Sequence, residues 1–86
     1  MNLKIIISRE FKREYKKLTK TERKAIFSAL LRMRRDPKYP SLRIKKMQKY
    51  KNLWEARASR DLRILFLLDG HAIYLVTCGH HKVEDR

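Results

Sequence analysis

The sequence predicts an α+β protein in which two N-terminal helices cover one face of an antiparallel sheet. Three observations predict it: a β-branched run at the N-terminus, apolar residues at helical spacing up to residue 35, and three strand-like runs after residue 52. The expected order is β-α-α-β-β-β, in a single domain spanning residues 1–86. The second face of the sheet is then left for a ligand.

The first two elements are a short strand and a helix. Residues 3–7 form a β-branched run, which is typical of a strand. Ser8 follows, and its hydroxyl is suited to cap a helix N-terminus. Phe11, Tyr15 and Leu18 are spaced i, i+4, i+7, so they share the face of a helix that points to the core.

A second helix is predicted from about residue 20 to residue 35. Thr19 and Glu22 fit the capping-box pattern at its start. Ile26, Leu30 and Met33 form its buried stripe. Pro37 then stops the helix, because proline cannot continue it.

The remainder of the chain is predicted to form a connector and three strands. Residues 37–52 contain two prolines and many Lys residues, so we expect an irregular basic connector with a short strand near residues 43–47. The three strands are expected at residues 53–58, 62–68 and 72–78. Asp69-Gly70 predicts a hairpin turn between the last two, and Gly79 is expected to end the last strand.

Positive charge is the most prominent property of the composition. The formal net charge is +14, and residues 1–52 hold 18 Lys/Arg against 4 Asp/Glu, so the whole excess lies there. Such a field attracts polyanions and accelerates their encounter. The candidate partners are nucleic acid, an acidic membrane surface and an acidic protein.

Several classes of protein are excluded. A single cysteine, Cys78, allows no disulfide within the chain, which suits a reducing compartment. The N-terminal apolar run is too short for a signal peptide, and no stretch has the length of a membrane span. We therefore expect a cytoplasmic protein. Cys78-Gly79-His80-His81 lacks a second ligand cluster, so we expect no metal and no cofactor.

Strand alternation predicts a polar group on the open face of the sheet. In residues 53–58, Trp54, Ala56 and Ala58 share one face, and we place them against the helices. Glu55 and Arg57 then point to the open face together with Arg63 of the next strand, and His80 and His81 are expected just past the end of the last strand.

These residue types are those of a metal-free ribonuclease. In such an enzyme the 2′-hydroxyl of the RNA attacks the adjacent phosphate. The reaction needs a base for the hydroxyl proton, an acid for the leaving oxygen and fixed positive charge at the phosphate. Histidine suits proton transfer near neutral pH, and the arginine fork matches phosphate oxygens. The candidate catalytic residues are Glu55, Arg57, Arg63 and His81.

A structural role remains an alternative for each of these residues. Arg63 in an apolar strand is costly to bury unpaired, so it can instead pair with Glu55 across the sheet. Glu55 and Arg57 fit ordinary half-exposed strand positions, and His80 and His81 fit a solvated chain end.

The ordered combination of these features resembles the RelE/ParE superfamily of toxins. The stretch LWEARASRDLRILFLLDGHAIYLVTCGHH is similar to their C-terminal half. The N-terminal part, with a helix that starts at Ser-x-x-Phe and a second helix that ends at Asp-Pro, also fits. The resemblance covers nearly the whole chain and implies a RelE-like fold, related to microbial ribonucleases.

The resemblance also implies site residues. Arg63 matches the strand arginine that RelE-like and YoeB-like toxins place on the scissile phosphate, and His81 matches a catalytic histidine of YoeB-like and YafQ-like members. Arg57 lies where YafQ-like members have another active-site histidine. The two strand lysines of RelE fall on Trp54 and Ala56, so they do not carry over. We expect RNA contacts instead from Lys45, Lys46, Lys49, Arg60 and His80.

The function implied by the resemblance is ribosome-dependent cleavage of translated mRNA by the toxin of a toxin–antitoxin pair. The implied partners are the ribosome and a cognate acidic antitoxin, which would join the toxin in a heterotetramer and contact DNA. Leu65 and Leu67 are candidate antitoxin contacts. Two alternatives stay open: a ParE-like inhibitor of DNA gyrase, and a non-catalytic basic module that binds nucleic acid. The second stays open because no tyrosine follows His81, where many members have one.

Overall fold

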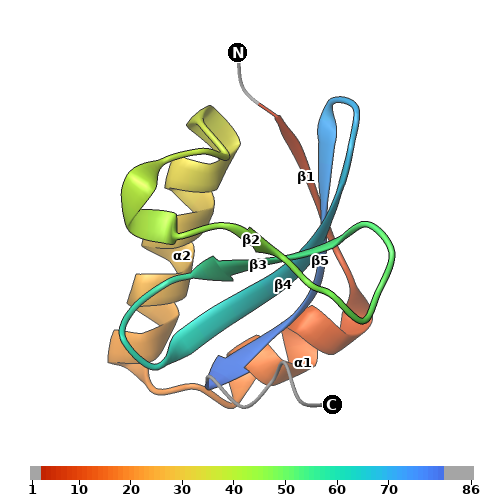
Figure 1. Cartoon of the computed structure of the whole chain (residues 1–86). Helices are drawn as coiled ribbons and strands as arrows, with labels where there is room; N and C mark the ends of the chain where they lie inside the picture. The colour runs from red at the N-terminus through yellow and green to blue at the C-terminus, as the bar shows by residue number, and fades with distance from the viewer. Residues whose placement is uncertain (1–2, 81–86) are drawn as a thin grey trace.

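A computed structural model describes residues 3–80, and its elements follow the predicted order, including the short strand expected near residues 43–47 (Figure 1). The helices are α1 (Arg9–Lys16), α2 (Lys20–Arg35) and the 3-10 turn η1 (Pro40–Leu42). The strands are β1 (Lys4–Ile7), β2 (Lys45–Lys46), β3 (Leu53–Arg57), β4 (Leu62–Asp69) and β5 (Ala72–His80). Within residues 3–80 they form one sheet in the order β1-β5-β4-β3-β2.

Both predicted helix caps are present. The Phe11 backbone N–H donates to Ser8 Oγ at 3.0 Å, and the Ser8 hydroxyl donates to the Val76 carbonyl at 2.8 Å, so the start of α1 is tied to β5. At α2, Glu22 N–H donates to Thr19 Oγ1 at 3.1 Å, and Thr19 N–H donates to Glu22 Oε1 at 2.8 Å. These bonds satisfy backbone donors that a helix leaves unpaired at its N-terminus, and so they fix where each helix begins.

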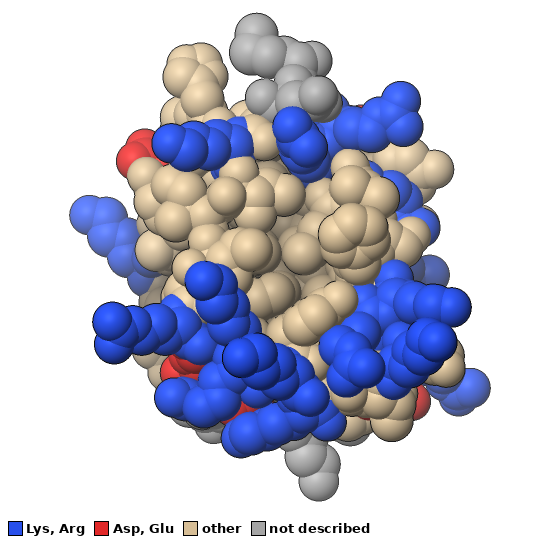
Figure 2. Space-filling view, turned by 180° about the vertical axis from the view of Figure 1, so that it is seen from behind, with Lys and Arg blue, Asp and Glu red and all other residues tan. Residues whose placement is uncertain are grey.

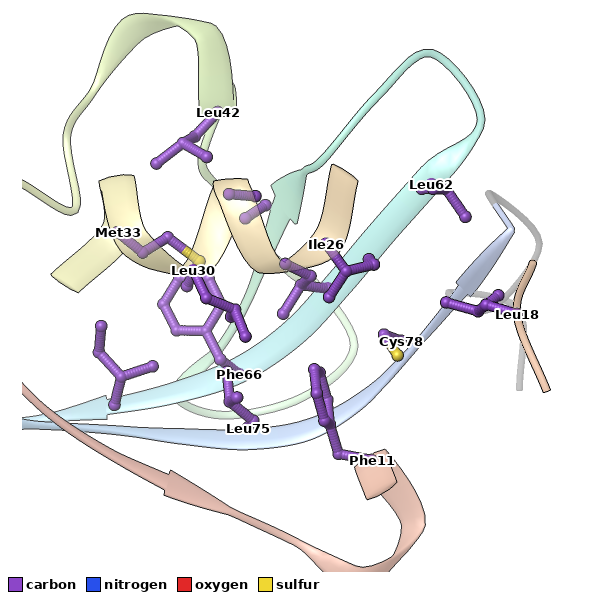
Figure 3. Close-up of a cluster of buried hydrophobic side chains, with 14 residues drawn as sticks. Phe11, Leu18, Ile26, Leu30, Met33, Leu42, Leu62, Phe66, Leu75 and Cys78 are labelled. Carbon is purple, nitrogen blue, oxygen red and sulfur yellow. The ribbon is translucent and has the colours of Figure 1, made fainter. Parts of the chain in front are cut away.

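The hydrophobic core lies between the two helices and one face of the sheet (Figure 3). The predicted stripe of α2 is buried there against β4, whose Ile64 and Phe66 are fully inaccessible to solvent. Ala56 is also fully buried, and Trp54 and Ala58 pack against the same cluster, as alternation predicts. Burial raises the pKa of the Cys78 thiol to about 12, so this cysteine is a neutral core residue.

The pairing of the strands corrects the sequence prediction in two places. β1 runs parallel to β5, with Ile5 opposite Ile73, so the sheet is mixed and only its other pairs are antiparallel. A parallel neighbour is possible because the helices α1 and α2 follow β1 and form part of a long crossover connection.

The second correction concerns the ends of β5. Gly79 does not end this strand, because it pairs with Arg63 and is followed by His80, which pairs with Leu62. At the other end, Asp69 pairs with Ala72, so the hairpin loop consists of Gly70 and His71 rather than of Asp69 and Gly70. Gly70 has a φ of 56°, in the left-handed region that favours glycine in a two-residue hairpin loop.

None of the helices in residues 3–80 has the length and apolar composition needed to cross a membrane.

Candidate nucleic-acid interface

The face of the sheet opposite the helices carries its side chains in three rows across the strands. One row joins Lys45, Glu55, Leu65 and Thr77, as the register of β2, β3, β4 and β5 shows. Beside it, Arg57 lies directly opposite Arg63, and Gly79 follows on β5. On the other side is an apolar row of Leu53, Leu67, Tyr74 and Ile6. The predicted gathering of Glu55, Arg57 and Arg63 on this open face is therefore confirmed.

Glu55 is the centre of a charged cluster on the open face. Its side chain is only 6% exposed, and Oε1 lies 3.8 Å from Arg63 Nε and 3.6 Å from Lys45 Nζ. The interpretation of Glu55 as an ordinary half-exposed strand residue is therefore wrong. A carboxylate that has lost its water needs such partners, and the ion pairs across β2, β3 and β4 provide them.

Arg63 is held in place by the turn that precedes it. Its Nη1 donates to three carbonyl oxygens, those of Ser59 and Arg60 at 3.0 Å and that of Leu62 at 3.1 Å. Together with Nε beside Glu55, these contacts hold the guanidinium against the protein. The planar group is thus oriented before any ligand arrives.

Arg57 places a second positive charge directly opposite Arg63. Its Nε is buried, and no group within residues 3–80 accepts a hydrogen bond from it. Like charges at opposite positions of an antiparallel pair repel each other. Lys45 and Arg63 lie beside the carboxylate of Glu55, and Arg57 shares this face opposite Arg63, so the cluster has an excess of positive charge. An anion placed between the two arginines would relieve this repulsion.

Thr77 belongs to the same face and was not singled out by sequence reasoning. It lies opposite Leu65, it is 3% exposed, and its hydroxyl has no hydrogen-bond partner within residues 3–80. An unpartnered buried hydroxyl is energetically unfavourable. The sequence signal is weak: one polar residue between Tyr74 and Cys78 in an apolar strand.

The structure does not bring His80 to this cluster. His80 pairs with Leu62, which faces the helices, and its Nε2 lies 2.9 Å from Glu22 Oε2 at the start of α2. This contact joins the end of β5 to the capping box of α2. His81, the predicted proton-transfer residue, lies outside the residues that the structure describes.

The remaining predicted RNA contacts are dispersed. Lys45 lies on the open face beside Glu55, but Lys46 pairs with Trp54, whose side chain packs against the core. Alternation therefore turns Lys46 toward the opposite side of the sheet. Lys49 and Arg60 are exposed in the loops between β2 and β3 and between β3 and β4. Arg60 belongs to the turn that holds Arg63.

The two leucines predicted to contact an antitoxin differ in accessibility. Leu65 is 6% exposed, so it is already covered and offers little area to a partner. Leu67 is partly exposed and lies in the apolar row beside Tyr74.

The contacts of Glu22 predict a measurable dependence of stability on pH. The hydrogen bond from the Thr19 backbone, followed by that with His80, lowers the pKa of Glu22 below its ordinary value of 4.5. A carboxylate with a lowered pKa stabilises the fold above pH 4.5, and this contribution is lost as the pH falls through the folded-state pKa. Glu22→Gln should therefore show a smaller drop in Tm between pH 7 and about pH 3 than the wild type.

The matched control for this experiment is Asp61→Asn, which changes an exposed acid in the turn between β3 and β4. This variant should keep the pH dependence of the wild type. If the Tm of Glu22→Gln falls as much as that of the wild type over this pH range, the capping contacts do not stabilise the ionised carboxylate of Glu22.

Comparisons with known proteins define the class of fold. No model of a known protein family matches the chain, and no curated protein matches it closely. Solved structures do match over nearly the whole chain, and several of them are toxin–antitoxin complexes.

Three of these structures illustrate the likeness. The archaeal RelE–RelB complex from Pyrococcus horikoshii matches with a TM-score of 0.79 and 14% identity, over 96% of this chain and 99% of that chain. The E. coli toxin RelE, as a double mutant in the free state, matches with 0.76 and 14%, over 99% and 90%. The RelB–RelE complex from Methanococcus jannaschii matches with 0.72 and 22%, over 90% and 91%. The resemblance to RelE toxins is thus confirmed at the level of the fold.

Proposed function

We propose that this chain is the toxin of a toxin–antitoxin pair and that it cleaves translated mRNA on the ribosome as an endoribonuclease. The observation that carries the proposal is the Arg57–Arg63 pair on the open face, where two arginines lie opposite each other on adjacent strands and Arg63 Nε lies 3.8 Å from Glu55 Oε1. The RelE-like fold and the net charge of +14 support the same conclusion.

The proposed reaction uses the RNA's own nucleophile. The 2′-oxygen attacks the adjacent phosphorus as its proton leaves to a base, and a new P–O bond forms. The bond from phosphorus to the 5′-oxygen breaks, and that oxygen receives a proton from an acid. The products are a 2′,3′-cyclic phosphate and a free 5′-hydroxyl, so atoms and charge balance without an oxidant or a metal.

Each residue of the cluster has a proposed role in this step. Arg57 and Arg63 bind the non-bridging phosphate oxygens, where negative charge builds up in the transition state. Glu55 acts as a positioning residue, because its Oε1 holds Arg63 Nε and Lys45 Nζ on the open face. His81 is proposed to transfer protons, since histidine is the residue type best suited to proton transfer near neutral pH.

The proposed partners follow from charge and from the likeness in fold. The solved complexes from Pyrococcus horikoshii and Methanococcus jannaschii contain RelE with RelB. We therefore extend to this chain a cognate antitoxin that is acidic and neutralises the toxin until it is released. The exposed Lys49 and Arg60 suit phosphate contacts with ribosomal RNA or mRNA. Action on translated mRNA would make the proposed toxin a cytoplasmic protein.

One observation favours a second candidate, a basic module that binds nucleic acid without cleaving it. Three backbone carbonyls and Glu55 already hold Arg63, which is what a purely structural arginine would show. In that case Arg57 and the surrounding lysines would bind phosphate, and no strand would be cut.

Primer extension on mRNA from a purified translation reaction tests the proposal. The wild type should cut within translated codons only when ribosomes are present. His81→Ala should lose most of the activity, on the order of 100-fold, because the acid–base contribution is removed. Cleavage that persists without ribosomes would contradict the proposed substrate. Binding of mRNA without any cut would establish the second candidate.

A further inference from the structure

The apolar row of the open face is partly exposed, and the proposed cleavage does not use it. Tyr74 of β5 lies opposite Leu67 of β4 on one side and opposite Ile6 of β1 on the other. Tyr74 and Ile6 are each 36% exposed, and Leu67 and Leu53 are half-buried. The row therefore presents an aromatic ring between aliphatic side chains.

This row lies on the same surface as the proposed phosphate site. Leu67 follows Arg63 by four residues in β4, so the two side chains share the open face about 13 Å apart along the strand. Beyond the row, Lys4 and Asp69 lie at the hairpin end of the sheet, opposite the same residue of β5. An RNA strand bound at the two arginines of this face can therefore continue over Tyr74 toward Lys4.

The edge of the sheet beside the apolar row is basic and hollowed. An open hollow of about 500 Å³ is lined by Lys46, Lys51, Asn52 and Leu67. Residues 37–54, which include this edge, contain six Lys/Arg and no Asp or Glu. A ligand that covers the row therefore meets positive charge along one side, which favours a polyanion.

The other exposed apolar side chains have a different setting. Phe27 and Leu31 of α2, on the helix side, are 55% and 46% exposed. Figure 2 shows the molecule from behind, where Lys and Arg side chains gather at the borders of a broad area without charge. RNA lying across such an area has few cations to bind. On the open face, in contrast, Arg57, Arg63 and the apolar row share one surface.

We infer that the apolar row is a base-stacking subsite, where Tyr74 stacks on an unpaired base of the RNA strand bound at Arg57 and Arg63. The identity of this ligand rests on the proposed function. Stacking on an aromatic side chain contributes affinity for any base, because every base has a flat aromatic face. Leu67 and Ile6 flank the tyrosine and add apolar contacts at the edges of the stacked base.

Two other occupants explain less of this surface. A second copy of the chain would bring its own charge of +14 against the same basic edge, which opposes association. A helix of a partner protein needs a broad apolar area, but the row has one residue from each strand and the row of Lys45 and Glu55 lies beside it. A single base is small enough to be covered by this narrow strip.

The test uses a short single-stranded 2′-O-methyl RNA that carries one 2-aminopurine, placed at each position in turn. The fluorescence of this base falls when it stacks, and the strand cannot be cut because it has no free 2′-hydroxyl. The control oligonucleotide has an abasic site at the position of strongest quenching. We expect the base to raise the affinity about tenfold over the abasic control, which is the effect of stacking on one aromatic side chain.

Variants of Tyr74 separate stacking from phosphate binding. Tyr74→Leu keeps apolar bulk in the row but has no ring, so it should lose most of the quenching and of the tenfold advantage of the base. Tyr74→Phe should keep both. The slope of affinity against salt concentration should stay unchanged in Tyr74→Leu and decrease in Arg57→Ala, because only the second variant loses a phosphate contact. Phe27→Ser, which alters an exposed aromatic residue of α2, should bind as the wild type does.

Several outcomes would overturn the inference. Equal affinity for the base and the abasic strand, quenching that persists in Tyr74→Leu, or no binding of the oligonucleotide would each do so. If Tyr74→Leu turns a dimer into a monomer in sedimentation, the row belongs to an interface between two copies. No strand is cut in this assay, so an absence of nuclease activity would appear only in the primer-extension experiment and would leave the stacking result unaffected.

Discussion

Arg57→Ala should lower the rate of mRNA cleavage by about 100-fold or more, while the free energy of unfolding stays within about 0.5 kcal/mol of the wild type or rises. Arg57 Nε has no partner within residues 3–80, so its removal breaks no hydrogen bond in that range. It also removes the repulsion with Arg63 across the strands. The rate falls because a fixed positive charge at the phosphate is lost.

Single-turnover primer extension and urea unfolding, run on the same preparations, measure the two quantities. Arg57→Lys keeps the charge but not the fork, so its rate should fall between those of wild type and Arg57→Ala. Lys38→Ala removes an exposed charge after α2 and should change the rate less than about threefold. A wild-type rate in Arg57→Ala would remove Arg57 from the site and leave the open face without its proposed phosphate contact.

Arg63→Met should have the largest effect on stability, a loss of about 3–5 kcal/mol in the free energy of unfolding. The substitution removes three hydrogen bonds to the turn carbonyls and takes from Glu55 one of its cationic neighbours. Glu55 is nearly inaccessible to water, so its charge would be poorly compensated. A domain of this size has a total stability of only about 5–15 kcal/mol, so much of it would be lost.

Arg60→Met is the control, because Arg60 is exposed in the same turn and should change stability by less than about 0.5 kcal/mol. Urea unfolding at pH 7 measures both variants. If Arg63→Met is as stable as Arg60→Met, the contacts of Arg63 are not structural, and its loss of activity can be assigned to phosphate binding alone. If it is strongly destabilised, activity must be measured under conditions where the variant is folded.

The two arginines of the open face are therefore expected to contribute differently to the stability of the fold and to catalysis. Arg63 is expected to serve both, because its Nη1 is bound to the turn and it lies opposite Arg57 on the open face. Arg57 Nε has no hydrogen-bond partner among residues 3–80. We expect the ratio of lost activity to lost stability to be highest for Arg57.

Local patterns in the sequence determined most of the secondary structure. Ser8 and the pair of Thr19 and Glu22 are caps because of hydrogen bonds that span three residues, and such bonds form in any context that starts a helix. Alternation placed Trp54 and Ala56 toward the core and Glu55 toward the open face, since this depends on strand geometry alone. The extension of β5 past Gly79 was missed because it depends on pairing with β4.

The chemistry of the candidate site was visible in the residue types, but its geometry was not. The sequence by itself determined a basic α+β chain with Glu55, Arg57 and Arg63 on one face, because composition, capping and alternation are local properties. Only the tertiary structure decided that Glu55 is buried between Arg63 and Lys45, that His80 contacts Glu22, and that Phe27 and Leu31 remain exposed. These features depend on contacts between segments that are far apart in the sequence. The strand register and the packing of α2 on β4 determine those contacts.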